Sequence, residues 1–403
     1  MSVKKRYSMG SYLAGAVAAR AGDEMSGPAL MLAGFALAGS TTDASSLLAG
    51  VTISAAAGGP VLGVLLDRAV RPGRLVAGAL VLYAAGLGLI LVGLGRLPFA
   101  VTVLIAVVTG LLGPALSGGW TAQLPRVVPG GRLPRANALD AMTFSAASLA
   151  GPALAGVGAE ALGAPSAVVV SAALIVSALP AAWLLPARHG RARDARATSV
   201  IGDLAAGTRV IAGRPPLARA TLTSIVTCVA QGMLTACVPL LGERALGGAG
   251  RGAVLLSCAA ISALVANAVL ARFPRSVAPD TVIWASALVQ AAGLALCTSG
   301  RPAVLIVAVL ILGAGEGPQL AALFAVRHRE APERLRGQIF TTGASFKITG
   351  FAVGAAVAGP AAHWSLPGAV ALAATVAVLA ALVFFAVPSA RVASSAGRAE
   401  SNS

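Results

Sequence analysis

A few charged residues stand inside stretches of sequence that are otherwise apolar. Arg20, Asp23 and Glu24 lie near the start of the chain, whereas Glu316 and Lys347 lie in two apolar stretches near its end. A charge in membrane hydrocarbon costs roughly 2.5 to 3.5 kcal/mol on insertion scales, so it persists where pairing or function requires it. These residue types predict proton exchange by a carboxylate, or a cation that holds either a carboxylate or a substrate anion.

The spacing of these charges limits which of them can meet. At about 1.5 Å per helical residue, Glu316 and Lys347 reach similar depths in neighbouring spans, so an ion pair between them is feasible. This pair is either purely structural or part of the coupling chemistry. Arg20 precedes Asp23 by three residues and Glu24 by four, which allows an intrahelical pair or a solvated first turn. Because the two adjacent carboxylates project about 100° apart, we expect one of them to face a central cavity.

The elements that position these charges are apolar stretches long enough to cross a bilayer, which takes about 20 helical residues. The chain is 57% hydrophobic and 11% charged, unlike an average soluble domain. We predict an all-α membrane protein with twelve transmembrane helices. The predicted spans are 12–39, 46–66, 75–95, 99–124, 138–162, 165–185, 217–241, 253–273, 281–299, 302–326, 339–362 and 367–387.

The net charge of +16 is explained by topology. Most arginines and lysines fall on alternate connections between the predicted spans, and by the positive-inside rule these connections and both termini are cytoplasmic. This placement argues against a nucleic-acid partner. We therefore expect a multi-pass protein of the plasma or inner membrane whose partners are the lipid bilayer and a small-molecule substrate.

Six predicted spans precede the long charged connector and six follow it. We expect an N-terminal six-helix bundle at 1–190, a cytoplasmic connector at 191–216, and a C-terminal six-helix bundle with a short tail at 217–403. Two local similarities, each half a chain length apart, support a duplication. The segment 63–71 aligns with 267–275, and 135–137 aligns with 336–338.

The segment Gly63-x-Leu-x-Asp67-Arg68-x-x-Arg71 resembles motif A of the major facilitator superfamily. This resemblance implies the superfamily fold, two pseudo-symmetric six-helix bundles around a substrate path near the bilayer midplane. It also implies that Gly63 allows close helix packing, and that Asp67 latches the cytoplasmic side at the dipole of the eleventh span. In the alternative interpretation the arginines only set the topology.

In the fifth span, Ala147-x-x-x-Gly151-Pro152-x-x-Ala155-Gly156 resembles motif C, a pattern associated with proton-coupled exporters. The match is partial, because alanine replaces glycine at 147 and 155. The structural alternative is a kink or a close-packing site, since proline removes one helical hydrogen bond.

Three further segments, at 20–23, 124–129 and 135–139, resemble bacterial exporters related to the enterobactin and macrolide efflux proteins. One feature of many proton-coupled relatives is missing, because residues 99–124 contain no arginine. Any proton coupling must then use other intramembrane groups.

Several polar or large side chains in the spans are candidates for contact with a substrate: Met25, Trp120, Gln231, Met233 and Gln319. Each of them also has a simpler explanation as a packing or lipid-facing residue. No catalytic or metal-binding residues are expected. The four cysteines have no metal-ligand spacing, the three histidines form no hydrolytic grouping, and there is no nucleotide-binding glycine loop.

From these patterns we expect no cofactor and a proton gradient as the energy source. The predicted function is proton-coupled efflux of a small amphiphilic compound or drug by a monomeric secondary transporter that works by alternating access. The alternatives are a facilitator or uptake carrier for a small metabolite and, less favoured, a membrane sensor or enzyme.

Overall fold

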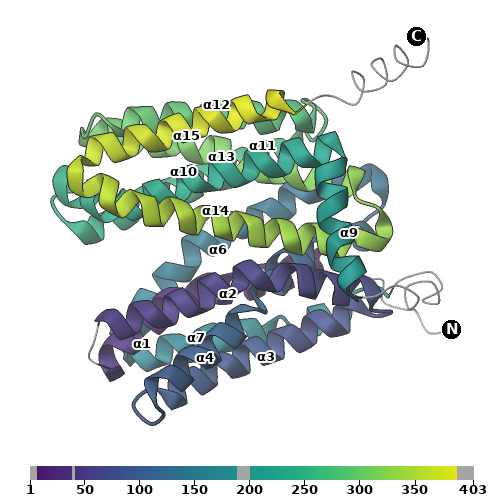
Figure 1. Ribbon diagram of the computed structural model, residues 1–403, viewed down its shortest axis with the longest axis horizontal. Coiled ribbons are helices and arrows are strands. Elements are labelled where there is room, and N and C mark those ends of the chain that lie inside the picture. Colours follow the sequence, from purple (N-terminus) through teal and green to yellow (C-terminus); the bar gives the residue numbers. More distant parts are fainter. Residues whose placement is uncertain (1–6, 39–40, 188–199, 388–403) are drawn as a thin grey trace. The chain divides into compact units, whose positions relative to one another are not determined.

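The computed structural model describes residues 7–38, 41–187 and 200–387, and every regular element in these ranges is a helix (Figure 1). The chain divides into two compact units. Unit 1 comprises Met1–Leu204, Asn267–Arg272 and Glu333–Thr349, and unit 2 comprises Ala205–Ala266, Phe273–Pro332 and Gly350–Ser403. Unit 1 therefore includes two short segments from the second half of the sequence. The predicted limits of the two six-helix bundles stay a prediction.

Unit 1 is built around its first helix, which packs against α6 and α7, while α2 packs against α4 and α3 against α7. The contact between α1 and α7 is close, because a Cβ atom on Gly22 would lie 2.8 Å from the carbonyl oxygen of Ser171. The helices are α1 (Met9–Ala38), α2 (Thr41–Arg68), α3 (Pro72–Gly93), α4 (Phe99–Gly110), η1 (Ala115–Gly119), α5 (Leu124–Val127), η2 (Gly130–Arg132), α6 (Leu133–Leu162), α7 (Ala164–Ser177) and α8 (Leu179–Trp183).

The fourth predicted span, 99–124, is present as the segment Phe99–Gly119, but it is not one continuous α-helix. Helix α4 ends at Gly110, and the chain continues through a short π-helix, η1, before α5 begins at Leu124. Pro114 directly precedes η1 and has no N–H to donate, so the regular hydrogen-bond ladder cannot pass through it. Single π-helical turns of this kind are often found at functional sites. The sixth span is likewise divided, between α7 and α8.

In unit 2, α12 packs against α13 and α15, and α10 packs against α15. Its apolar core joins buried residues of α10, α12, α13 and α15, among them Met233 and Leu312. The remaining elements are α9 (Val200–Gly213), α10 (Pro215–Leu246), η4 (Ala249–Arg251), α11 (Gly252–Arg272), α12 (Pro279–Cys297), α13 (Pro302–Glu330), η5 (Glu333–Leu335), α14 (Arg336–Trp364) and α15 (Leu366–Ala386). Helix α9 lies in the predicted connector, for which the sequence indicated no helix.

In the described part of the chain, ten helical segments have the length and composition of a membrane span. Two further long helices, α1 and α14, occupy the positions of the first and eleventh predicted spans. Helix α1 contains Arg20, Asp23 and Glu24, and α14 contains Lys347. The prediction of an all-helical membrane protein is confirmed.

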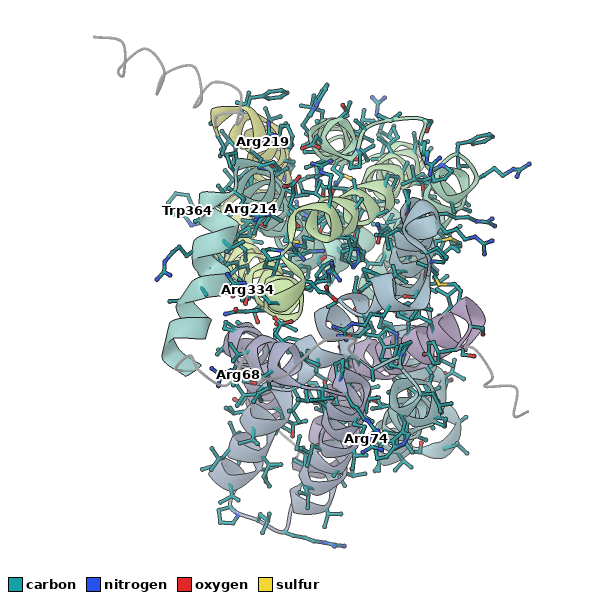
Figure 2. The ribbon with its side chains drawn as sticks, turned by 90° about the vertical axis from the view of Figure 1, so that its right-hand side faces the viewer. Arg68, Arg74, Arg214, Arg219, Arg334 and Trp364 are labelled. Carbon is teal, nitrogen blue, oxygen red and sulfur yellow. The ribbon has the colours of Figure 1, made fainter. Side chains whose placement is uncertain are left out.

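Arginines mark the helix ends within each unit. In unit 1, Arg68 ends α2 and Arg74 lies in the first turn of α3, with its guanidinium 5.0 Å from the ring centre of Trp183. In unit 2, Arg214 directly precedes α10 and Arg219 follows within the first two turns of that helix (Figure 2). These are connections that the charge distribution assigns to the cytoplasm.

Candidate functional site

A buried ion pair joins α1 to α6 inside unit 1. Arg20 Nη1 lies 2.8 Å from Asp140 Oδ1, and the two side chains are 2% and 0% exposed. Arg20 Nη1 also donates to the Asp140 carbonyl oxygen at 3.1 Å. Arg20 is thus buried rather than solvated, and the ion pair at 2.8 Å is with α6 rather than with a carboxylate of its own helix. The physical reason is that α6 supplies an acceptor with two carboxylate oxygens at the place where the guanidinium is buried.

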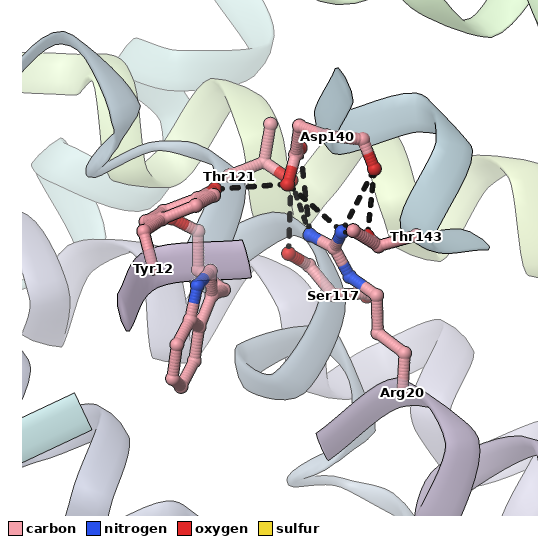
Figure 3. Close-up of polar contacts among 7 residues, drawn as sticks. Tyr12, Arg20, Ser117, Thr121, Asp140 and Thr143 are labelled. Atoms are coloured by element: carbon pink, nitrogen blue, oxygen red, sulfur yellow. Dashed lines mark hydrogen bonds and ion pairs between the residues drawn. The ribbon is translucent and has the colours of Figure 1, made fainter. Parts of the chain in front are cut away.

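Hydroxyl groups complete this arrangement (Figure 3). Thr121 Oγ1 donates to Asp140 Oδ2 at 2.8 Å and accepts from Arg20 Nη2 at the same distance. Tyr12 Oη donates to Asp140 Oδ1 at 3.0 Å, and Arg20 also bonds to Thr143 Oγ1. The Asp140 carboxylate is therefore surrounded by donors. We call these five residues the Arg20–Asp140 cluster.

Each member of the cluster is fixed by the helix that carries it. Thr121 follows the π-helix η1, where the helical path of the fourth span is displaced. The Tyr12 and Trp120 rings have centroids 6.0 Å apart, and the Arg20 guanidinium lies 3.7 Å above the centre of the Phe144 ring. Aromatic rings thus cover the ion pair and exclude water, which strengthens the electrostatic interactions within it.

A second polar group lies further along α1. The Asp23 carboxylate is hydrogen-bonded to the Tyr83 hydroxyl on α3, and that hydroxyl lies 3.1 Å from Ser26 Oγ. Asp23 is half-buried, while the adjacent Glu24 is exposed. The two carboxylates thus have different surroundings, in agreement with their predicted divergence. A coupling role for either remains a prediction.

Helix α6 approaches α1 at this same level. A Cβ atom on Gly151 would lie 2.7 Å from the Glu24 Cβ and 2.9 Å from the Met25 nitrogen. Only glycine therefore fits at 151 without displacing α1. At Gly156 no atom lies within 4 Å of the corresponding position, and Pro152 is exposed. Of the glycines and the proline in the motif C-like segment, Gly151 is the one at which the structure shows close packing, whereas Ala147 and Ala155 are fully buried.

The motif A carboxylate binds the first turn of α14 within unit 1. Asp67 Oδ1 accepts a hydrogen bond from the Gly337 nitrogen, and Oδ2 accepts one from the Gln338 nitrogen, each at 2.8 Å. The sequence led us to expect this contact with the eleventh span. A carboxylate in this position satisfies two N–H groups that have no partner within the helix and meets the positive end of the helix dipole. Its role as a gate stays a prediction.

Small residues on α2 bring it against the first half of α14. Added Cβ atoms at Gly59 and Gly63 would overlap the backbone of Thr341 and Gln338. Thr341 Oγ1 donates to the Gly59 carbonyl oxygen at 2.6 Å. Arg68, which ends α2, is half-buried, and Arg71, which directly precedes α3, is exposed. The close packing predicted for Gly63 is therefore present.

Unit 2 contains a chain of carboxamides that crosses three helices. Gln231 of α10 donates to Gln290 Oε1 of α12 at 3.0 Å, and Gln290 donates to Gln319 Oε1 of α13 at 3.1 Å. Gln290 and Gln319 are 1% and 6% exposed, and Gln231 is half-buried. Glu316 is half-buried three residues before Gln319. Two of the predicted substrate residues thus belong to one network.

The other predicted site residues lie elsewhere. Met25 and Trp120 are 0% exposed and Met233 is 1% exposed, so no surface of these side chains is open to a substrate in this arrangement. Lys347 is half-buried in α14. It belongs to unit 1 and Glu316 to unit 2, so their pairing stays a prediction. Among the described residues, no group of three or more His, Cys, Asp or Glu side chains could hold a metal ion.

Sequence reasoning missed Asp140, Thr121, Thr143 and Tyr12. A signal for Asp140 was present, because it is a carboxylate near the start of the predicted fifth span and therefore belongs with the other intramembrane charges. The hydroxyl residues gave no comparable signal, since threonine and tyrosine are ordinary components of membrane helices.

Long apolar helices that bury an ion pair and a chain of carboxamides define a polytopic membrane protein of the transporter class. The sequence matches the Major Facilitator Superfamily over residues 12–279. The chain therefore belongs to this superfamily. No curated protein matches it.

Three solved structures illustrate the shared fold. A bacterial homologue of the iron transporter ferroportin, in its outward-facing state, has a TM-score of 0.74 and 14% identity, covering 94% of this chain and 98% of its own. The human organic anion transporter MFSD10 has a TM-score of 0.72 and 15% identity, with 95% and 100% covered. The E. coli fucose:proton symporter has a TM-score of 0.70 and 16% identity, with 94% and 98% covered. Such identities establish the fold alone.

Proposed function

We propose that this protein is a proton-coupled secondary transporter that exports a small amphiphilic compound across the plasma or inner membrane as a monomer. The observation that carries the proposal is the buried pair of Arg20 and Asp140. A carboxylate in a membrane interior that holds a cation is suited to exchange that cation for a proton, because protonation removes the charge that keeps the cation in place.

The cluster contacts connect proton binding to helix packing. Ionised Asp140 accepts hydrogen bonds from Arg20 and Tyr12 on α1 and from Thr121 after η1. When a proton binds Asp140, the attraction to Arg20 falls, and the guanidinium then needs another acceptor. Proton binding therefore favours a different packing of α1 against α6, which is the differential interaction that coupling requires.

The cluster also supplies a guanidinium near the fourth span, which has no arginine of its own. Arg20 extends from α1 to Thr121, so a guanidinium reaches this region from another helix. In relatives the arginine belongs to the fourth span itself. The likeness of segments 20–23 and 135–139 to bacterial exporters supports the same role, as does the glycine contact at Gly151 in the motif C-like segment.

Flux measurements in inside-out vesicles test the proposal. Fluorescent cationic, neutral and anionic amphiphiles are added under an imposed pH gradient, and proton movement is followed for the native chain and for Asp140→Asn. We expect substrate-dependent proton release from the native protein and its loss in the variant. Asp280→Asn is a matched control, because Asp280 belongs to unit 2, where it forms a half-exposed surface pair with Arg329 at 2.9 Å. Equal coupling in Asp140→Asn and native protein would refute the assignment.

An uptake carrier or a facilitator is the second candidate, favoured by the fold shared with a fucose:proton symporter. The two directions are distinguished by vesicle orientation. An exporter accumulates substrate in inside-out vesicles with an acidic lumen, whereas a symporter accumulates it in right-side-out vesicles under an inward proton gradient. Flux that follows only the substrate gradient identifies a facilitator.

A further inference from the structure

The three carboxamides of unit 2 are Gln231, Gln290 and Gln319. The contacts of Gln319, at the buried end of this chain, determine which group donates in each hydrogen bond. Gln319 Nε2 donates to the Ile283 carbonyl oxygen at 3.2 Å and to Thr227 Oγ1 at 3.3 Å. The backbone carbonyl can only accept. The Thr227 hydroxyl already donates to the Thr223 carbonyl oxygen at 2.8 Å, so its oxygen also accepts. Gln319 must therefore present its NH₂ group to this side and its Oε1 to Gln290.

The orientation of Gln319 determines the orientations of the other two carboxamides in turn. Because Gln319 offers an oxygen, Gln290 must offer its NH₂ group, which also donates to the Ser286 carbonyl oxygen at 3.3 Å. Gln290 Oε1 then faces Gln231, and Gln231 must donate with its own NH₂ group at 3.0 Å. The backbone carbonyls of Ile283 and Ser286, which can only accept, thus decide the orientation of three side-chain amides, independently of how oxygen and nitrogen are distinguished in any one of them.

One oxygen remains at the open end of the chain. Among the described residues no donor bonds to Gln231 Oε1, and Gln231 is the half-buried member of the three. An amide oxygen facing lipid would be costly, so polar groups in membrane helices turn toward the bundle interior or a water-filled path.

We infer that Gln231 Oε1 is the acceptor of a substrate subsite that selects a molecule carrying a hydroxyl or N–H donor on an apolar body. This inference adds a substrate class to the proposed transport function. It rests on that proposal, because only a transporter would carry the bound molecule as its substrate. The buried chain forces the selection, because Gln231 cannot turn its NH₂ group outward without breaking its bond to Gln290. A site that is fixed as an acceptor discriminates against analogues that lack the donor, since its oxygen is then left unpaired.

Matched ligand pairs test this subsite in the full chain in lipid nanodiscs. One pair is 4-phenylbutylamine and its N,N,N-trimethylammonium analogue, which have the same charge but differ in N–H donors. The other is 6-phenylhexanol and its methyl ether. Equilibrium binding is measured for each compound. We expect the donor-bearing member of each pair to bind about 5- to 10-fold more tightly, as one hydrogen bond provides.

Three variants separate the acceptor from its support. Gln231→Met keeps the side-chain length and removes the acceptor, so the preference should fall to about 1-fold. Gln290→Leu frees Gln231 to rotate its amide, so binding should persist with a reduced preference. Asp280→Asn is the control, because Asp280 forms a surface pair with Arg329 and takes no part in the carboxamide chain, so the preference should remain. Thermal unfolding of each variant confirms that it folds.

An equal preference in native protein and Gln231→Met would overturn the inference, because the discrimination would then be steric. Equal binding of both members of each pair, or no binding by any of the four compounds, would overturn it as well. The proposed function is tested by flux and not by this binding experiment, so the two can fail independently. A donor preference in a protein that shows no proton-coupled flux leaves the subsite in place and removes only the coupling.

Discussion

The carboxylate of Asp67 caps the first turn of α14, at Gly337 and Gln338. Its two oxygens accept the backbone N–H groups of Gly337 and Gln338 at 2.8 Å each. Asp67→Asn keeps one amide oxygen but removes the charge, so the favourable interaction with the helix dipole should fall by about 0.3 to 1 kcal/mol. We expect slower transport with normal membrane insertion and abundance, measured as initial flux per amount of protein in the membrane.

The control for Asp67 is Asp280, which lies in the first turn of α12 on the surface of unit 2. Asp280→Asn should leave transport near the native rate. If Asp67→Asn also transports at the native rate, the cap has no gating role. It then serves only to provide hydrogen-bond acceptors for the first N–H groups of α14.

The Arg20–Asp140 cluster predicts a contrast between single and double variants. Replacing Asp140 by Leu leaves a buried guanidinium without its counter-charge, a loss of about 3 to 5 kcal/mol in known buried pairs. Replacing Arg20 by Met at the same time removes both charges and should recover most of the stability. The measurement is thermal unfolding in detergent with a binding-independent dye.

Transport assays on the same variants distinguish a structural role of the ion pair from a role in proton coupling. The double variant is expected to fold well and to show no proton-driven flux. If it transports with native coupling, the ion pair is a packing element and the proton is carried elsewhere, with Asp23 and Glu24 next to be tested.

Hydroxyl donors around Asp140 give a graded prediction. Thr121→Val removes the donor to Asp140 Oδ2 and an acceptor for Arg20 while preserving shape. Arg20 and Asp140 then each lose one hydrogen bond, so the free energy of unfolding should fall by about 1 to 3 kcal/mol and initial flux should decrease. Thermal unfolding and flux are measured on the variant. Native stability together with native flux in Thr121→Val contradicts this reading of Thr121.

Much of the fold follows from composition, because each span must supply about 20 apolar residues to cross a bilayer. The contact of Asp67 with α14 was also foreseeable, since topology places the end of the second span and the start of the eleventh at the same membrane surface. The break in the fourth span was not. Gly113-Pro114 resembles the Gly-Pro pairs at 59–60 and 317–318, which lie within the continuous helices α2 and α13.

The partner choices inside the bundles were the least predictable part. Sequence spacing offered Arg20 two carboxylates on its own helix, whereas the structure gives it Asp140, which is 120 residues away. Gln290 was overlooked because it is a neutral residue in an apolar stretch, and its importance lies in joining Gln231 to Gln319. Contacts of this type depend on helix rotation, which hydropathy does not determine.

Gly151 and Gly156 offer a matched test of the motif C-like segment. An alanine Cβ at 151 would lie 2.7 Å from Glu24 Cβ and 2.9 Å from the Glu24 carbonyl carbon, so α6 must move away from α1. At 156 an alanine Cβ would meet no atom within 4 Å. We expect Gly151→Ala to destabilise the protein by about 1 to 3 kcal/mol, as overpacked sites do, and Gly156→Ala to be nearly neutral. Because α1 carries Arg20 and Asp23, Gly151→Ala should also reduce coupled flux. Thermal unfolding and flux measured on both variants decide the matter, and equal behaviour of the two would show that the α1 to α6 contact at Glu24 is looser than its geometry implies.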